Sequence, residues 1–168
     1  MATLIPLERL STKRDAEVCA RLMASSEPWL TLGRSYETSL TIVQDPSRET
    51  YVARDGGELA GFLIICMIGA FVGYIQTICI HPQYRGRGLG SSMLEFAERR
   101  ILSEVPNVFM CVSSFNNAAR RLYERLGYQV VGELTDYIVA GHSEILLRKT
   151  LGPLTGPRHA GPDPSESR

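Results

Sequence analysis

Residues 74–90 read Tyr-Ile-Gln-Thr-Ile-Cys-Ile-His-Pro-Gln-Tyr-Arg-Gly-Arg-Gly-Leu-Gly, which combines a strand pattern, a glycine-rich turn and the start of a helix. The apolar, β-branched run ends at Pro82, which has no N–H group to continue a ladder. Three glycines follow closely: Gly86, Gly88 and Gly90. A glycine-rich turn between a strand and a helix directs backbone N–H groups at an anion, and the helix dipole adds partial positive charge. The segment therefore predicts a pyrophosphate-binding turn, with Arg85 and Arg87 beside it.

Two other phosphate-binding patterns fit this turn less well. A nucleoside-triphosphate loop requires Gly-x-x-x-x-Gly-Lys-Ser/Thr, and no lysine follows Gly90. A dinucleotide-binding fold requires Gly-x-Gly-x-x-Gly, and the position for its third glycine is Ser91. A plain strand-to-helix turn without a ligand stays open on this segment alone.

A second motif lies at 116–128, which reads Asn-Asn-Ala-Ala-Arg-Arg-Leu-Tyr-Glu-Arg-Leu-Gly-Tyr. Arg85-x-x-Gly88-x-Gly90 followed by a helix resembles the acetyl-CoA pyrophosphate motif of the GNAT superfamily of N-acetyltransferases. The later stretch is similar to that family's second signature, Asn-x-x-Ala-x-x-Leu-Tyr-x-x-x-Gly-Phe/Tyr. The matching positions are Asn116, Ala119, Leu122, Tyr123, Gly127 and Tyr128. The resemblance spans residues 3–150.

The resemblance implies an α/β (α+β) fold, in which a mixed, mostly antiparallel sheet of six to seven strands is flanked by about four helices. Two central strands, at 74–80 and 107–112, would splay apart in a V and open a cleft. The residue pattern alone predicts strands at 4–7, 49–54, 58–68, 74–80, 107–112, 129–133 and 144–149, and helices after Ser11 and Thr12, at 35–43, 91–102 and 116–126.

Length and composition bound the class of protein. The 168 residues are 44% hydrophobic and 21% charged, which is ordinary for one globular domain. We expect that domain at 1–150 and a disordered, proline- and glycine-rich tail at 151–168. Eighteen basic and eighteen acidic residues cancel, which disfavours a nucleic-acid partner. The four cysteines form no Cys-x-x-Cys pair, so we expect neither a disulfide framework nor a metal site. No leader or membrane-spanning run is evident, so we expect a cytoplasmic protein without membrane contact. We expect the protein to be a monomer or a homodimer.

The resemblance implies an enzyme that moves an acetyl group from acetyl-CoA, its only expected cofactor, to a primary amine of a small molecule or a protein. The amine would attack directly in a ternary complex. Tyr123, whose free pKa is about 10, would protonate the leaving thiolate, and an N–H group near Cys79 or Ile80 would polarise the acetyl carbonyl. The cofactor would contact Ile78, Cys79, Ile80, Arg85, Gly86, Arg87, Gly88, Leu89, Gly90, Ser91, Asn116, Ala119 and Tyr123.

The residues at the positions expected for the general base differ from the family pattern. Many members carry a glutamate on one of the splayed strands, but here those positions hold Cys111 and, on the other strand, Tyr74 or Gln76, which are poor bases at neutral pH. A catalytically inactive, acyl-CoA-binding domain therefore stays an alternative. The remaining candidates for the base are Glu27, Glu37, His142 with Glu144, and a relay through water. The acceptor is expected to contact Glu27, Trp29, Tyr74, Gln76, Cys111 and His142.

Overall fold

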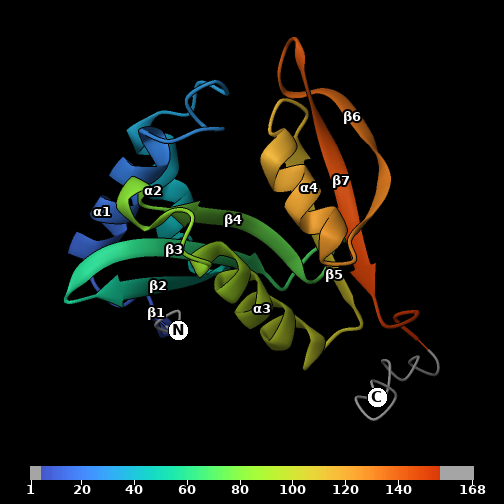
Figure 1. The fold of residues 1–168 in the computed structure, drawn as a ribbon, viewed down its shortest axis with the longest axis horizontal. Helices are drawn as coiled ribbons and strands as arrows, with labels where there is room; N and C mark the ends of the chain where they lie inside the picture. The colour runs from blue at the N-terminus through green and yellow to red at the C-terminus, as the bar shows by residue number, and fades with distance from the viewer. Residues whose placement is uncertain (1–4, 156–168) are drawn as a thin grey trace.

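Seven strands and four α-helices make up the part of the chain that the computed structural model describes, residues 5–155 (Figure 1). Their order is β1 (Leu7–Arg9), α1 (Lys13–Ala24), α2 (Tyr36–Gln44), β2 (Glu49–Asp55), β3 (Glu58–Cys66), β4 (Tyr74–Ile80), a 3₁₀ turn η1 (Pro82–Tyr84), α3 (Leu89–Leu102), β5 (Asn107–Ser113), α4 (Asn117–Arg125), β6 (Gln129–Val139) and β7 (His142–Thr150). The expected mixture of one sheet and four helices is confirmed.

The strands form a single sheet in the order β1-β2-β3-β4-β5-β7-β6, and only β4 and β5 are parallel. The predicted mixed, mostly antiparallel sheet is therefore confirmed. The limits of two strands differ from the predicted ranges: β1 begins at Leu7, and β6 continues to Val139. The alternation of apolar residues stops near Glu133, but β6 keeps pairing with β7 through an irregular register between Leu134 and Val139. Pairing across a hairpin thus extends a strand that alternation alone would end.

The sheet opens between β4 and β5, as the V-shaped splay requires. These two strands pair only at Tyr74↔Phe109 and Ile75↔Met110, although each is seven residues long. A register shift at the same point places Ile65 opposite Ile75 but Ile64 opposite Thr77, so β4 holds one extra residue there. Such a bulge bends a strand and increases its twist. The bend turns β4 away from β5 directly after their last paired residues.

Helices cover both faces of the sheet (Figure 1). The pair α1 and α2 packs on one face, where the core contains Cys19, Met23, Phe62 and Ile64. On the other face α3 buries Leu89, Met93, Ala97 and Ile101, which the helical spacing places on one side. The helix α4 carries no fully buried residue and lies beside β5 and β7, across the splay from α3. No described helix has the length and apolarity needed to cross a membrane.

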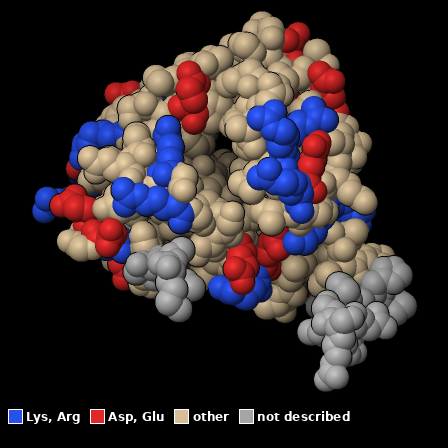
Figure 2. Space-filling view, in the orientation of Figure 1, with Lys and Arg blue, Asp and Glu red and all other residues tan. Residues whose placement is uncertain are grey.

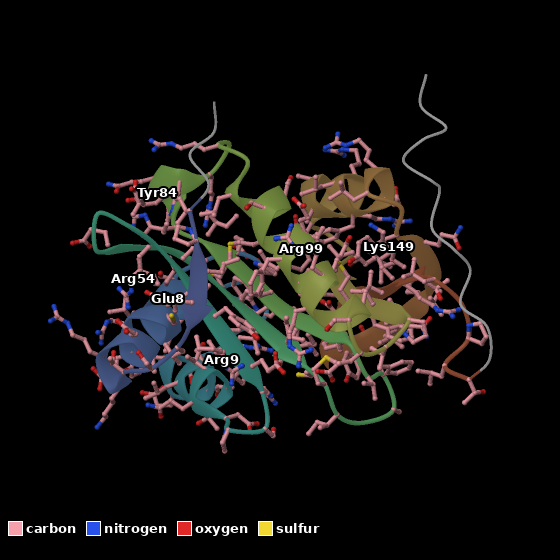
Figure 3. The ribbon with its side chains drawn as sticks, turned by 90° about the horizontal axis from the view of Figure 1, so that it is seen from below. Glu8, Arg9, Arg54, Tyr84, Arg99 and Lys149 are labelled. Carbon is pink, nitrogen blue, oxygen red and sulfur yellow. The ribbon has the colours of Figure 1, made fainter. Side chains whose placement is uncertain are left out.

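Ion pairs connect elements within and across the two halves of the sheet. Figure 3 shows Arg54 beside Glu8, and its guanidinium also reaches Asp15 at 2.6 Å, so β2 is joined to β1 and α1. Lys149 Nζ lies 2.7 Å from Glu98 Oε2 and joins β7 to α3 across the splay. Each pair is partly exposed and contributes on the order of 1 kcal/mol or less. The pair of Lys149 and Glu98 thus links the part of the sheet that contains β7 to α3.

Hydrogen bonds to the folded body continue past the end of β7 at Thr150, into the segment predicted to be a tail. Leu151 donates its backbone N–H to Pro106 O at 2.8 Å, and Gly152 is buried and donates to Thr150 Oγ1 at 3.0 Å. These two residues therefore belong to the folded body. The prediction of disorder for 156–168 lies outside the described residues.

Gly73 fixes the point where β4 and β5 meet, and its replacement tests that role. Its φ is +87°, and a Cβ there would lie 2.5 Å from Asn107 O and 2.6 Å from Ile101 Cγ2. We expect Gly73→Ala to lower the free energy of unfolding by about 2 to 4 kcal/mol, because left-handed strain and overpacking add. Gly69→Ala is the matched control: its φ is +89° with nothing within 4 Å, so only the backbone cost of about 1 to 2 kcal/mol applies. Equal losses in urea unfolding would contradict the close-packing argument.

Candidate active site

A cleft of about 770 Å³ lies where β4 and β5 part. Tyr123 and Asn116 line it on the side of α4, and Trp29 and Arg34 line it on the side of the segment between α1 and α2. Figure 2 shows the hollow between the two halves of the molecule, with basic side chains gathered over α4 beside it. The cleft therefore connects the two faces of the sheet, and a group entering from one face can meet a group entering from the other.

Tyr123, the residue predicted to act as the acid, is a residue of the cleft wall. It lies on α4, lines the cleft, and packs edge-on against the ring of Tyr128 at 6.1 Å between centroids. Burial raises the pKa of Tyr123 above its ordinary value, so its hydroxyl stays protonated at neutral pH. Asn116 starts the same helix, where its Oδ1 accepts the backbone N–H of Ala119 at 3.3 Å. The cap fixes the start of α4 and with it the direction from which Tyr123 enters the cleft.

The glycine-rich turn leaves the first turn of α3 open. Gly88 is the N-cap in a left-handed conformation, and no side chain caps the helix, so its first N–H groups have no intrahelical partner. Arg85 Nε donates to Ile80 O at 3.1 Å, and the Arg87 guanidinium lies 5.6 Å from the ring centre of Tyr84, the residue labelled in Figure 3. Two fixed positive charges thus flank an open helix N-terminus. This arrangement can bind a phosphate or pyrophosphate.

The free edge of β4 offers backbone groups to the cleft at alternate residues. His81 donates its N–H to Ala60 O at 2.9 Å, so the antiparallel alternation directs the amide of Cys79 at β3 and the amides of Ile78 and Ile80 at the splay. The Cys79 side chain is also buried, and burial raises the pKa of its thiol to about 12. Of the two predicted positions for the carbonyl-polarising N–H, the amide of Cys79 faces β3 and the amide of Ile80 faces the splay. The amide of Ile78 also faces the splay, and Ile78 lines the cleft, which makes it a further candidate.

The structure brings together most of the residues expected to contact an acceptor. Trp29, Tyr74, Gln76 and Cys111 all line the cleft. Two others do not line it. The exposed Glu27 accepts the backbone N–H of Thr31 at 3.2 Å, and the His142 ring packs against Phe115 at 4.9 Å between centroids. Across residues 5–155 no group of three or more His, Cys, Asp or Glu side chains is placed to hold a metal ion.

Three cleft residues on the acceptor side, Arg34, Ser113 and Glu144, are absent from the set expected to contact the acceptor. Glu144 is 4% exposed, and its Oε1 accepts the Ser113 hydroxyl at 2.6 Å across the β5–β7 pair. Burial raises the pKa of Glu144, while the bond from Ser113 and the charge of Arg34 act against that rise. From the sequence alone, Glu144 is a candidate for the base only together with its neighbour His142. Its place in the cleft follows from the register between β5 and β7, which no local pattern contains.

Comparison with known proteins agrees with this geometry. The sequence profile of the family described as "Acetyltransferase (GNAT) family" matches residues 15–128. The N-alpha-acetyltransferase RimI of Mycobacterium tuberculosis is 30% identical over 158 residues, which are 89% of this chain and 93% of that protein.

Solved structures share the fold at low sequence identity. The ribosomal-protein-S18-alanine N-acetyltransferase of Escherichia coli superposes with a TM-score of 0.70 at 20% identity, over 94% of this chain and 97% of the other. An aminoglycoside 6'-N-acetyltransferase complexed with coenzyme A gives a TM-score of 0.71 at 16% identity, over 90% of this chain and 100% of the other. These similarities establish the fold, and the residues of the cleft must carry the argument for the chemistry.

The glycine-rich turn predicts the effect of a side chain at its centre on binding of coenzyme A. Gly88 has a φ of +83° and no atom within 4 Å of the position of a Cβ. We expect Gly88→Val to raise the Kd for coenzyme A about 100-fold or more, because losing two hydrogen bonds to a charged group costs about 3 kcal/mol.

The matched control is Gly57→Val in the β2–β3 turn, where φ is +90° and no atom lies within 4 Å. It introduces the same backbone strain far from the cleft and should leave binding unchanged. Calorimetric titration of both folded variants compares them, and undiminished affinity in Gly88→Val would show that the phosphates lie elsewhere.

Proposed function

The chain belongs to the acetyltransferase (GNAT) family and is an acetyltransferase, and on that premise we propose that it moves an acetyl group from acetyl-CoA to a primary amine. The observation that carries the proposal is the continuous cleft between β4 and β5, which has Tyr123 toward one face and Glu144 toward the other. A donor and an acceptor can therefore meet through the sheet. The relatives support this reaction class, since one is named for acetylation of α-amino groups.

The cofactor side of the cleft fits acetyl-CoA. Its pyrophosphate would lie over residues 85–91, where open N–H groups and two arginines offer positive charge. The pantetheine arm would follow the free edge of β4 like an added strand, with Asn116 at the other wall. The N–H of Ile78 would then polarise the thioester carbonyl. An aminoglycoside 6'-N-acetyltransferase of the same fold binds coenzyme A, which supports the choice of cofactor.

The cleft favours direct attack by the amine over an acyl-enzyme. Cys66 and Cys111 line the cleft, but burial raises the pKa of each thiol, so at neutral pH both are protonated and poor nucleophiles. Tyr123 remains protonated and can give its proton to the departing thiolate. A protonated cleft thiol and a protonated Tyr123 hydroxyl are both consistent with direct attack of the amine in a ternary complex. They also favour an active enzyme over a domain that only binds acyl-CoA.

The acceptor we propose is a monoamine, either a small molecule or the amino group of a protein, attached to an apolar group. Exposed apolar side chains surround the acceptor end of the cleft: Ile68, Phe71, Tyr137 and Ile138. Arg34 adds a positive charge to the same wall, which disfavours an acceptor with several ammonium groups. The apolar rim can instead bury part of a side chain next to the reacting amine.

We also propose that the enzyme works in the cytoplasm, as a monomer or homodimer. All four cysteines are unpaired, and burial raises the pKa of Cys19 and Cys79 to about 12, so these two thiols are inert. Unpaired thiols are typical of a reducing compartment.

The direct test measures release of free coenzyme A thiol from acetyl-CoA with a panel of monoamines, polyamines and short peptides. Turnover that depends on an amine, with the acetylated amine identified by mass spectrometry, is the expected result. A protein that binds acetyl-CoA but releases no thiol with any amine would contradict the proposal.

Tyr123→Phe tests the acid. We expect the kcat to fall about 10- to 1,000-fold, because general acid catalysis contributes roughly 10² to 10⁴-fold, while the affinity for acetyl-CoA changes little. Tyr128→Phe is the matched control, since it removes a neighbouring hydroxyl in the core at a position where the family motif also accepts phenylalanine. If Tyr123→Phe keeps the parent rate across the pH range, the ring only packs and the acid lies elsewhere.

A further inference from the structure

The cleft contains one carboxylate. Among the described residues that line it, Glu144 is the only aspartate or glutamate, and no histidine is present. The strand positions where the family resemblance places a glutamate hold Cys111 and, on the other strand, Tyr74 or Gln76 in this chain. The acceptor would arrive mostly as an ammonium ion at neutral pH and must lose a proton before it can attack.

Glu144 lies one strand away from the expected position of the base. It belongs to β7 and faces Ser113 of β5, and Cys111 lies two residues before Ser113 on the same face of that strand. The carboxylate is therefore next to the expected position and opens on the same cleft. We propose that Glu144 accepts the proton of the acceptor ammonium, an inference that rests on the proposed transfer to an amine.

The hydrogen bonding of Glu144 leaves one oxygen available. Its Oε1 accepts the hydroxyl of Ser113 at 2.6 Å, and within the described residues no hydrogen bond engages Oε2. Glu144 lines the cleft, and Oε2 is not among the buried side-chain atoms of the described residues that lack a hydrogen-bond partner, so this oxygen keeps access to solvent. A carboxylate oxygen that has no protein partner and is open to solvent is suited to receive a proton from an ammonium group.

The groups around Glu144 keep it able to act as a base. Arg34 and the hydroxyl of Ser113 favour the carboxylate, whereas burial raises its pKa. Tyr74 and Cys111 face it from β4 and β5, and both stay protonated because burial raises the pKa of each. The pKa of Glu144 thus lies above the ordinary glutamate value, which lowers the mismatch with the pKa of an ammonium group.

Glu144 and Tyr123 together account for every proton transfer in the reaction. Glu144 takes one proton from the ammonium and passes it to solvent. The freed lone pair attacks the thioester carbon, the C–S bond breaks, and the thiolate takes a proton from Tyr123. The new amide nitrogen then releases its second proton, which restores Tyr123. The products are an amide, a free thiol and one proton in solution.

Replacement by glutamine removes the base and preserves the shape, since the glutamine carbonyl can still accept from Ser113. We expect Glu144→Gln to lower kcat/KM for an alkylamine at neutral pH about 10²- to 10⁴-fold, with unchanged affinity for coenzyme A. The loss should shrink as the pH rises through the pKa of the amine, because bulk solvent then supplies the free base. Glu133→Gln, an exposed residue on β6 outside the cleft, is the matched control and should behave as the parent.

Ser113→Ala provides a second test, which can be carried out even if Glu144→Gln folds poorly. Without the hydrogen bond that lowers it, the pKa of Glu144 rises further. Activity is lost as the pH falls through that pKa, so the acidic limb of the plot of kcat against pH should move to higher pH. The variant should keep enough activity for this shift to be measured. Running two acceptors of different amine pKa separates this limb from that of the substrate.

The outcomes distinguish the two proposals. A parent enzyme that acetylates no amine would refute the proposed function. An active parent whose Glu144→Gln variant keeps its rate, or loses the same factor at every pH, would overturn the role of Glu144 alone. An acidic limb that does not move in Ser113→Ala would also contradict it.

Discussion

The structure depends on the early separation of β4 and β5. Two parallel neighbours in one sheet pair at two positions and then part, so the facing edges carry backbone N–H and C=O groups without a strand partner. Close packing at Gly73 fixes where the strands meet, and the extra residue in β4 bends that strand away. An open interior edge is costly unless a ligand pairs with it. Binding of an extended cofactor arm and the opening of the sheet are therefore two aspects of one constraint.

The same opening divides the work between the two faces of the sheet. The phosphate-binding turn, α3 and α4 lie toward one face, and the segment between α1 and α2 lies toward the other (Figure 1). Tyr123 and Glu144 reach the cleft from different elements, α4 and β7, so the proposed acid and the proposed base enter it from different parts of the fold. A thioester bound between them would meet the amine on one side and the proton donor on the other.

Local signals in the sequence predicted the parts that are local in the structure. The strand at Tyr74–Ile80, the turn after it and the helix that Asn116 caps follow from proline, glycine and capping residues a few positions apart. Glu144 shows where this reasoning stops: its burial and its partner Ser113 are set by the pairing of β5 with β7, thirty-one residues apart in sequence. Cys79 shows the same limit, because only the register with β3 reveals which way its amide points.

A structure of the protein with a bisubstrate analogue, in which an alkylamine is linked to coenzyme A through the acetyl carbon, tests the central claim most directly. The account predicts that the pantetheine arm lies between β4 and β5, with the sulfur in hydrogen-bonding reach of the Tyr123 hydroxyl and the amine nitrogen on the side of Glu144. An ordered analogue bound outside the cleft, or with the amine directed away from the segment between α1 and α2, would contradict it.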